Sequence, residues 1–94
     1  MGRSQMETAI STEELLTQRG NIYGSYSAQV ECVSTIVMAM RYCADLNGNP
    51  PSAELIAEWH YLAIKIARMA ANEKYLDSYK DLIGYTTLMM AERN

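Results

Sequence analysis

Apolar residues recur every three or four positions along most of this chain, which is the spacing typical of α-helices rather than of strands. The most regular stretch follows Ser52 and ends near Asn72, with spacings that alternate between four and three. This helix is apolar around most of its circumference, so we expect it to lie at the centre of the fold, flanked by other helices. Its main seam consists of Leu55, Trp59, Leu62, Ile66 and Met69.

The N-terminal part of the chain predicts a short helix followed by a loop. Ser11 and Glu14 form a capping box, which opens a helix directly after Ser11. We expect Gly20 to end this helix. Residues 19–27 contain two glycines and two tyrosines, a composition that predicts an ordered loop.

Two further helices flank the central one in sequence. A helix is predicted over residues 28–46, because its valine, methionine and alanine side chains recur on one face. The adjacent Pro50 and Pro51 prevent this helix from continuing. After the central helix, Asp77 or Ser78 is expected to cap a last helix that runs to the C-terminus.

The pattern therefore predicts an all-α fold, a compact bundle of three main helices with a short N-terminal helix. A chain of 94 residues that is 49% hydrophobic makes one domain with a small core. We assign residues 11–94 to this single all-helical domain and residues 1–10, which are weakly patterned, to a flexible N-terminus. A monomer of this size has marginal stability, so a homo-oligomer is expected.

Charge and cysteine content limit the classes of function. The net charge of −3 argues against nucleic acid as a partner, since nucleic acid needs a basic face. No apolar run approaches the roughly 18 residues of a membrane span, and no hydrophobic signal peptide is present. Cys32 and Cys43 lie too far apart on one helix to bridge. We therefore expect reduced, partly buried thiols in a cytoplasmic protein.

Residues 65–85 carry charged groups at helical spacing on both sides of a turn. An antiparallel pair of helices here brings Arg68 across from Asp81, and an ion pair between them would fix the register. Lys65 then lies opposite Gly84. A glycine inside a helix costs about 1 kcal/mol relative to alanine, which predicts either a close helix contact or space for a ligand beside Lys65.

The carboxylates offer a second kind of site. Glu54 and Glu58 form one pair at helical spacing, and Asp77 and Asp81 form another. Two such pairs that face each other hold Mg²⁺ through oxygen ligands. In the expected register the pairs lie about 15 Å apart within one protomer, so a metal site would need a partner chain or a different register.

Seven tyrosines and no phenylalanine are an unusual balance for a plain core. Tyr23 and Tyr26 lie in the glycine-containing segment, where they either approach a phosphate and stack on a base or cover the helical hairpin. His60 has no neighbouring ligand set and is expected to be structural. Met89 and Met90 are expected to fill the core or an interface.

Two segments of the chain resemble a known family. RGNIYGSY and the later KIAR…YLDSYKDLIGY resemble small, mostly phage-encoded proteins of unassigned function with a YGDY-like loop, a K-[IL]-A-R helix and a DSW-x-D-[IL]-x-GY helix. The pattern is also similar to the nucleotide modification associated domain of phages, and more remotely to the MazG-like all-α nucleotide pyrophosphohydrolases. The resemblance covers residues 15–88.

This resemblance implies a helical fold that oligomerises and handles a nucleotide-like molecule. MazG-like enzymes gather four acids around Mg²⁺, whereas the helix over residues 28–46 carries only Glu31 and Asp45. Ser25 stands where the phage family commonly has an aspartate. The matching positions that we expect to bind ligand are Arg19, Tyr23, Gly24, Tyr26, Lys65, Arg68 and Tyr85, with Asp77 and Asp81 nearby.

The leading hypothesis is a phage-type protein that binds a nucleotide-like phosphorylated ligand at or near a subunit interface without turnover. Lys65 and Arg68 would contact phosphate, and Tyr23 or Tyr26 would stack on a base. No cofactor is required. Such a protein would sequester a host nucleotide immune signal in the host cytoplasm.

Two alternatives remain open. One is a Mg²⁺-dependent MazG-like nucleotide pyrophosphohydrolase that uses Glu58, Asp77 and Asp81 across a subunit interface. The other is an inhibitor that binds a host protein through the apolar central helix, with its charges solvating the surface.

Overall fold

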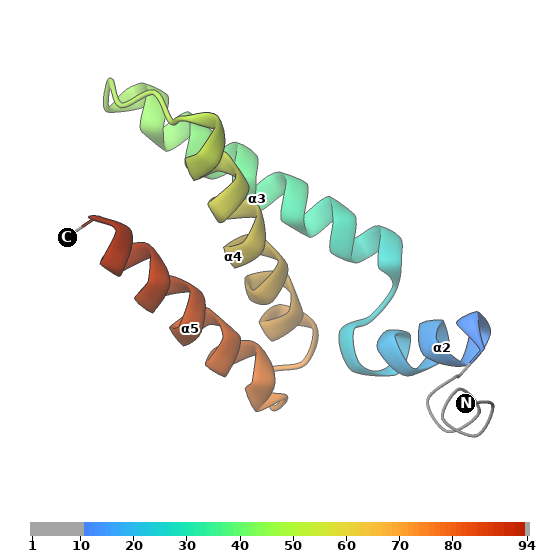
Figure 1. Cartoon of the computed structure of the whole chain (residues 1–94). Helices are drawn as coiled ribbons and strands as arrows, with labels where there is room; N and C mark the ends of the chain where they lie inside the picture. Colours follow the sequence, from blue (N-terminus) through green and yellow to red (C-terminus); the bar gives the residue numbers. More distant parts are fainter. Residues whose placement is uncertain (1–10, 94) are drawn as a thin grey trace.

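The structure is a computed structural model that describes residues 11–93. This part of the chain forms helices α2 (Thr12–Tyr23), α3 (Tyr26–Leu46), α4 (Ala53–Ala71) and α5 (Leu76–Arg93), as Figure 1 shows. The expected all-α fold, with three long helices and a shorter leading one, is confirmed. The flexible segment expected over residues 1–10 lies outside the described residues.

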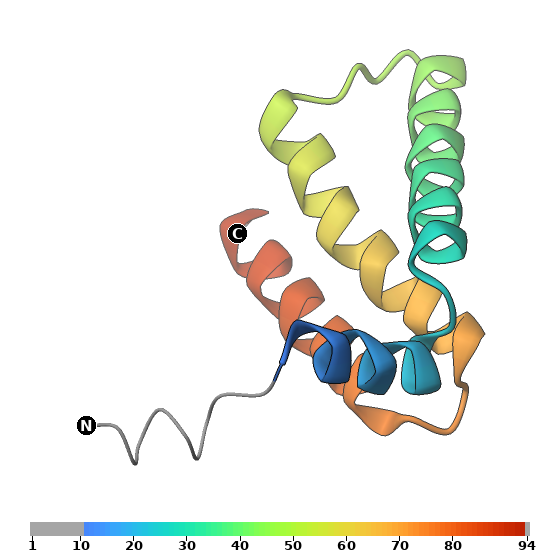
Figure 2. The same cartoon turned by 90° about the vertical axis from the view of Figure 1, so that its right-hand side faces the viewer.

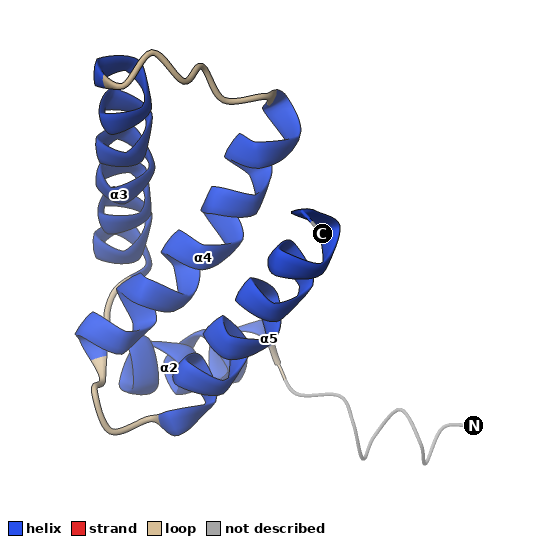
Figure 3. Ribbon diagram, turned by 90° about the vertical axis from the view of Figure 1, so that its left-hand side faces the viewer, coloured by secondary structure: helices blue, strands red, loops and turns tan. Residues whose placement is uncertain are grey.

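Helix α4 lies at the centre of the arrangement, as its sequence predicts. α3 and α5 pack on opposite sides of α4 and do not contact each other (Figure 1). Figures 2 and 3 show α2 crossing the end of this layer, where it contacts α3 and α4. Ala63 and Ala67, one turn apart on α4, are completely or almost completely buried. Because both side chains are small, the neighbouring helices approach the α4 backbone closely.

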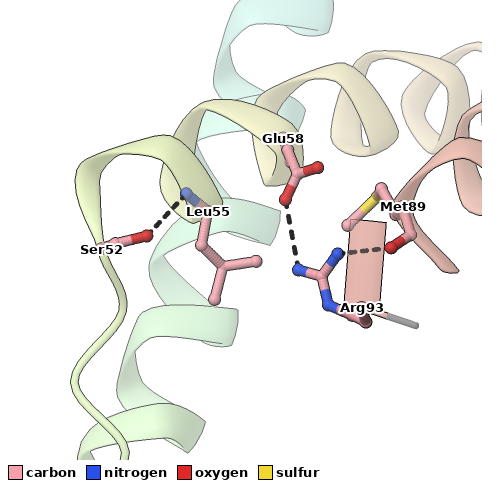
Figure 4. Close-up of polar contacts among 5 residues, drawn as sticks. All are labelled: Ser52, Leu55, Glu58, Met89 and Arg93. Carbon is pink, nitrogen blue, oxygen red and sulfur yellow. Dashed lines mark hydrogen bonds and ion pairs between the residues drawn. The ribbon is translucent and has the colours of Figure 1, made fainter. Parts of the chain in front are cut away.

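Serine side chains begin three of the four helices. The hydroxyl oxygens of Ser11, Ser25 and Ser52 accept hydrogen bonds of 3.0, 3.2 and 3.1 Å from the backbone N–H three residues further on. Figure 4 shows the bond from Leu55 to Ser52. Each cap satisfies a donor that the first helical turn leaves unpaired. The caps expected at Ser11 and Ser52 are confirmed, and Ser25 is an additional one.

The prediction of a loop over residues 19–27 is wrong. α2 continues through Gly20 and ends at Tyr23, so that only Gly24 and Ser25 separate it from α3. Gly24 has a φ of 83°, which an L-residue rarely adopts, and its N–H donates to the Gly20 carbonyl at 2.9 Å. Gly24 therefore ends the helix that we expected Gly20 to end.

The start of α5 also differs from expectation. The helix begins at Leu76, so Asp77 and Ser78 lie inside its first turn and do not cap it. The chain turns earlier because the Tyr75 N–H donates to the Asn72 carbonyl at 3.1 Å. Ser78 is 2% exposed and belongs to the face of α5 that packs against the rest of the fold.

The described residues bury few apolar side chains, and no large side chain among them is completely buried. The apolar core consists of Val37, Ala44, Ala63 and Ala67. Both cysteines are free, but only Cys32 is half-buried, because Cys43 lies exposed on α3. Within residues 11–93, no helix combines the length and the apolar character needed to cross a membrane.

Candidate functional site

A groove of about 890 Å³ lies between α2, α3 and α4. Its volume falls within the roughly 300–1,000 Å³ that small-molecule sites occupy in proteins. Most of its surface is apolar, since valine, leucine, isoleucine and methionine side chains from all three helices line it. These apolar residues are Leu16, Val30, Val33, Val37, Met38 and Ile64. The polar side chains are Arg19, Tyr23, Ser25, Tyr26, Gln29, Ser34, Arg41, His60 and Arg68.

The charged residues in the described lining of this groove are all arginines. The chain holds 11 acidic residues against 8 lysines and arginines, yet no described carboxylate lines the groove. Arg19 comes from α2, Arg41 from α3 and Arg68 from α4. Guanidinium groups bind phosphates and carboxylates through two parallel hydrogen bonds. The groove is therefore a cationic site in an acidic protein.

Tyr23 fixes one end of the groove. The Arg68 guanidinium carbon lies 4.3 Å from the centroid of the Tyr23 ring, a cation–π contact. The Tyr75 ring meets Tyr23 edge-on, with the ring centroids 5.8 Å apart. Together these contacts hold Arg68 against the last residue of α2 and join α2 to the turn before α5.

Gln29 reinforces the same end from α3. Its Nε2 donates to the Tyr23 carbonyl at 2.8 Å and to the Ala67 carbonyl at 3.3 Å. The Tyr23 carbonyl belongs to the last residue of α2, and the Ala67 carbonyl lies near the end of α4. One side chain thereby joins the ends of α2 and α4 and sets the position of Tyr23 relative to Arg68.

The surroundings of Tyr75 favour the neutral form of its phenol. Hydrogen bonding to Asp77, then the negative charge of Asp77, raises the pKa of Tyr75 above its ordinary value of 10.0, and Tyr23 acts in the same direction.

The groove gathers most of the residues that sequence reasoning assigned to a ligand. Gly24 lies in the short link between α2 and α3, and the others occupy the facing sides of the three helices. The predicted residues that line the groove are Arg19, Tyr23, Gly24, Tyr26 and Arg68. Lys65 and Tyr85 lie elsewhere, between α4 and α5.

At the contact between α4 and α5, Lys65 pairs with Asp81, its Nζ lying 2.9 Å from the carboxylate. The Lys65 side chain is 13% exposed, so its ammonium group is largely buried and has Asp81 as its charged partner. Tyr85 stacks on Tyr61, with ring centroids 5.5 Å apart and planes inclined by 29°. Both predicted residues thus have partners inside the helical hairpin.

The prediction of an ion pair between Arg68 and Asp81 is wrong. The prediction that Gly84 marks a close helix contact or a space for a ligand is also wrong. α5 begins earlier than expected, which shifts the register of α5 against α4 by about one helical turn. Asp81 therefore forms its ion pair with Lys65, and the Arg68 guanidinium contacts the Tyr23 ring instead. Gly84 is exposed, and a Cβ added there would meet nothing within 4 Å. Within the described chain it marks neither a close helix contact nor an enclosed space beside Lys65.

The carboxylates proposed for catalysis have separate partners. Glu58 accepts a hydrogen bond of 3.2 Å from Arg93, which also donates to the Met89 carbonyl at 2.7 Å (Figure 4). Asp81 pairs with Lys65. Among residues 11–93, no group of three or more His, Cys, Asp or Glu side chains could hold a metal ion. A site assembled from Glu58, Asp77 and Asp81 across an interface stays a prediction.

Sequence reasoning assigned no ligand role to five polar residues of the groove: Ser25, Gln29, Ser34, Arg41 and His60. The His60 Nδ1 lies 2.9 Å from the Ile56 carbonyl, so its other ring nitrogen is the one available to a ligand. A signal for Arg41 existed, because it continues at helical spacing the stripe of α3 that includes Val30 and Val37. An arginine at the end of an apolar stripe indicates that its guanidinium borders the same surface as the apolar side chains.

No protein-family model, curated protein or solved structure matches this chain. The resemblance to phage proteins and to MazG-like enzymes therefore stays a prediction.

Proposed function

We propose that the groove between α2, α3 and α4 binds a small phosphorylated ligand with a planar group, a nucleotide-like molecule, without turnover. The observation that carries this proposal is that three arginines and no described carboxylate line one largely apolar groove. Arginine provides the charge and the paired donors that a phosphate needs. The apolar wall provides the surface that a base or similar ring needs.

Each part of the ligand has a candidate partner. Arg19 and Arg41 contact the phosphate groups, and neither forms an ion pair with another described residue. Arg68 contributes from its place on the face of Tyr23. Tyr26 is 81% exposed and lines the groove, so its ring is open for stacking on a base, which is worth about 1–3 kcal/mol.

The side chains of the groove support binding without turnover. Phosphoryl hydrolysis at Mg²⁺ requires carboxylates that hold the metal ion, and no described carboxylate lines this surface. A protein of this kind fits the sequestration of a nucleotide signal in a host cell.

The proposal is tested by calorimetric titration with nucleotides, cyclic dinucleotides and ADP-ribose derivatives. We expect one class to bind, and Arg41→Ala to weaken its binding at least tenfold. Lys74→Ala is the matched control, because Lys74 is an exposed cation in the turn before α5, outside the groove. Failure of every ligand to bind contradicts the proposal, and so does release of phosphate that stops with EDTA.

A further inference from the structure

The outer face of α5 carries an apolar stripe that no other described helix covers. Leu76, Ile83 and Met90 follow one another at intervals of seven residues, and their side chains are 62%, 67% and 66% exposed. Figure 1 shows α5 at the edge of the helical layer, with α4 on its inner side. The exposed stripe therefore lies away from the packed face, which contains the buried Ser78.

The spacing of this stripe is that of a helix that packs against another helix. Apolar residues repeated every seven positions keep one seam facing a partner along the whole helix. Lys80 and Thr87 complete the seam at spacings of three and four, and both are exposed. Three large apolar side chains in one line differ from the single exposed apolar residues that are ordinary on a protein surface.

We propose that this stripe packs against the same stripe of a second copy of the chain, with the two α5 helices antiparallel and the twofold axis at Ile83. Leu76 and Met90 lie seven residues before and after Ile83. An antiparallel arrangement about Ile83 therefore places Leu76 on Met90 of the second copy and Ile83 on its counterpart. The stripe is complementary to itself, as a twofold interface requires.

The charge of Lys80 favours the same arrangement. In the antiparallel register Lys80 lies opposite Thr86 of the second copy. A parallel pair would instead align Lys80 with Lys80, placing like charges side by side. Charge and apolar spacing thus select one orientation.

Gly84 gives this interface room at its centre. It follows Ile83 directly, and the space where its Cβ would lie is open. The backbone of a second helix approaches closest where a side chain is missing. The small core of residues 11–93, in which no large side chain is completely buried, leaves stability to be gained from such a contact.

Cysteine cross-linking tests the orientation, in protein whose own thiols are removed by Cys32→Ser and Cys43→Ser. On oxidation we expect Ile83→Cys to form a disulfide-linked dimer, because its Cα atoms meet at the axis. Leu76→Cys alone is expected to stay monomeric in a denaturing gel, but to cross-link when mixed with Met90→Cys protein. Self-cross-linking of Leu76→Cys overturns the antiparallel arrangement, and an absence of any dimer at Ile83→Cys overturns the interface.

Sedimentation analysis tests the interface without cross-links. Ile83→Glu is expected to raise the dimer dissociation constant at least tenfold, while circular dichroism shows the helices intact. Tyr42→Glu is the matched control, since Tyr42 is 66% exposed on α3. Dissociation by Tyr42→Glu with no effect of Ile83→Glu overturns the proposal. α5 does not line the ligand groove, so ligand binding and dimerisation are tested separately.

Discussion

The guanidinium of Arg68 lies on the face of the Tyr23 ring, with 4.3 Å between its carbon and the ring centroid. This contact joins the end of α2 to α4 and places a cation at the edge of the groove. The edge-on contact with Tyr75 and the hydrogen bonds of Gln29 surround the same pair. Both the fold and the candidate site therefore depend on Tyr23.

Tyr23→Ala is expected to destabilise the protein by about 1–3 kcal/mol, because it removes the cation–π contact and the aromatic contact together. Tyr26→Ala is the control, since Tyr26 is 81% exposed, and its effect should stay within about 0.5 kcal/mol. Urea unfolding followed by circular dichroism measures both. Equal destabilisation by the two substitutions would contradict the role given to Tyr23.

Gly84→Ala is expected to stabilise the protomer by about 0.5–1 kcal/mol, because the helix there has room for a Cβ and alanine favours helix. Gly24→Ala should do the opposite, since a φ of 83° disfavours any side chain. Chemical unfolding at a concentration below the dimer dissociation constant separates these effects from association. A loss of stability in Gly84→Ala would show that the space beside Gly84 is occupied within the protomer.

Asp81→Asn is expected to lower stability by about 1 kcal/mol, because it leaves the largely buried Lys65 ammonium without its charged partner. Ligand affinity should be unchanged, since neither residue lines the groove. Thermal unfolding and calorimetric titration of the same variant measure the two quantities. A tenfold loss of affinity with unchanged stability would move the site to the contact between α4 and α5.

Asp77→Asn is expected to lower the pKa of Tyr75 toward 10.0, because hydrogen bonding to Asp77 and its charge raise that pKa. A raised pKa in the folded state means that folding stabilises the neutral phenol. Its contribution to stability is present below the unfolded pKa of about 10 and is lost as the pH rises through the folded pKa. Ultraviolet absorbance titration, with Tyr75→Phe to identify the signal, measures the shift. An unchanged titration curve in Asp77→Asn would contradict this assignment.

Much of the fold follows from the sequence. The alternating apolar seam from Leu55 to Met69 predicts the central position of α4, and Ser11 and Ser52 predict where helices begin. These features depend on local spacing and on hydrogen bonds within a few residues. Gly20 shows the limit of such reasoning, because glycine is tolerated inside a helix and only the backbone conformation at Gly24 decides where α2 ends.

The site is only partly predictable, because its residues come from three helices whose relative positions the local pattern does not determine. Arg19, Tyr23 and Tyr26 lie close together in sequence, and the local pattern predicts all three as ligand-binding residues. Arg41 joins them only because α3 packs on α4 in a particular register. The pairing of Lys65 with Asp81 depends on where the turn before α5 closes, and a shift of one helical turn changes the partner.

The most direct test of the proposed ligand groove is an NMR titration of the arginine side chains with the nucleotide class that binds. The Nε–Hε signals of Arg19, Arg41 and Arg68 are expected to shift on addition of ligand, because these three guanidinium groups line the groove. The signal of Arg93, which pairs with Glu58 outside the groove, should stay in place. A shift at Arg93 while the three groove arginines remain unchanged would contradict the account.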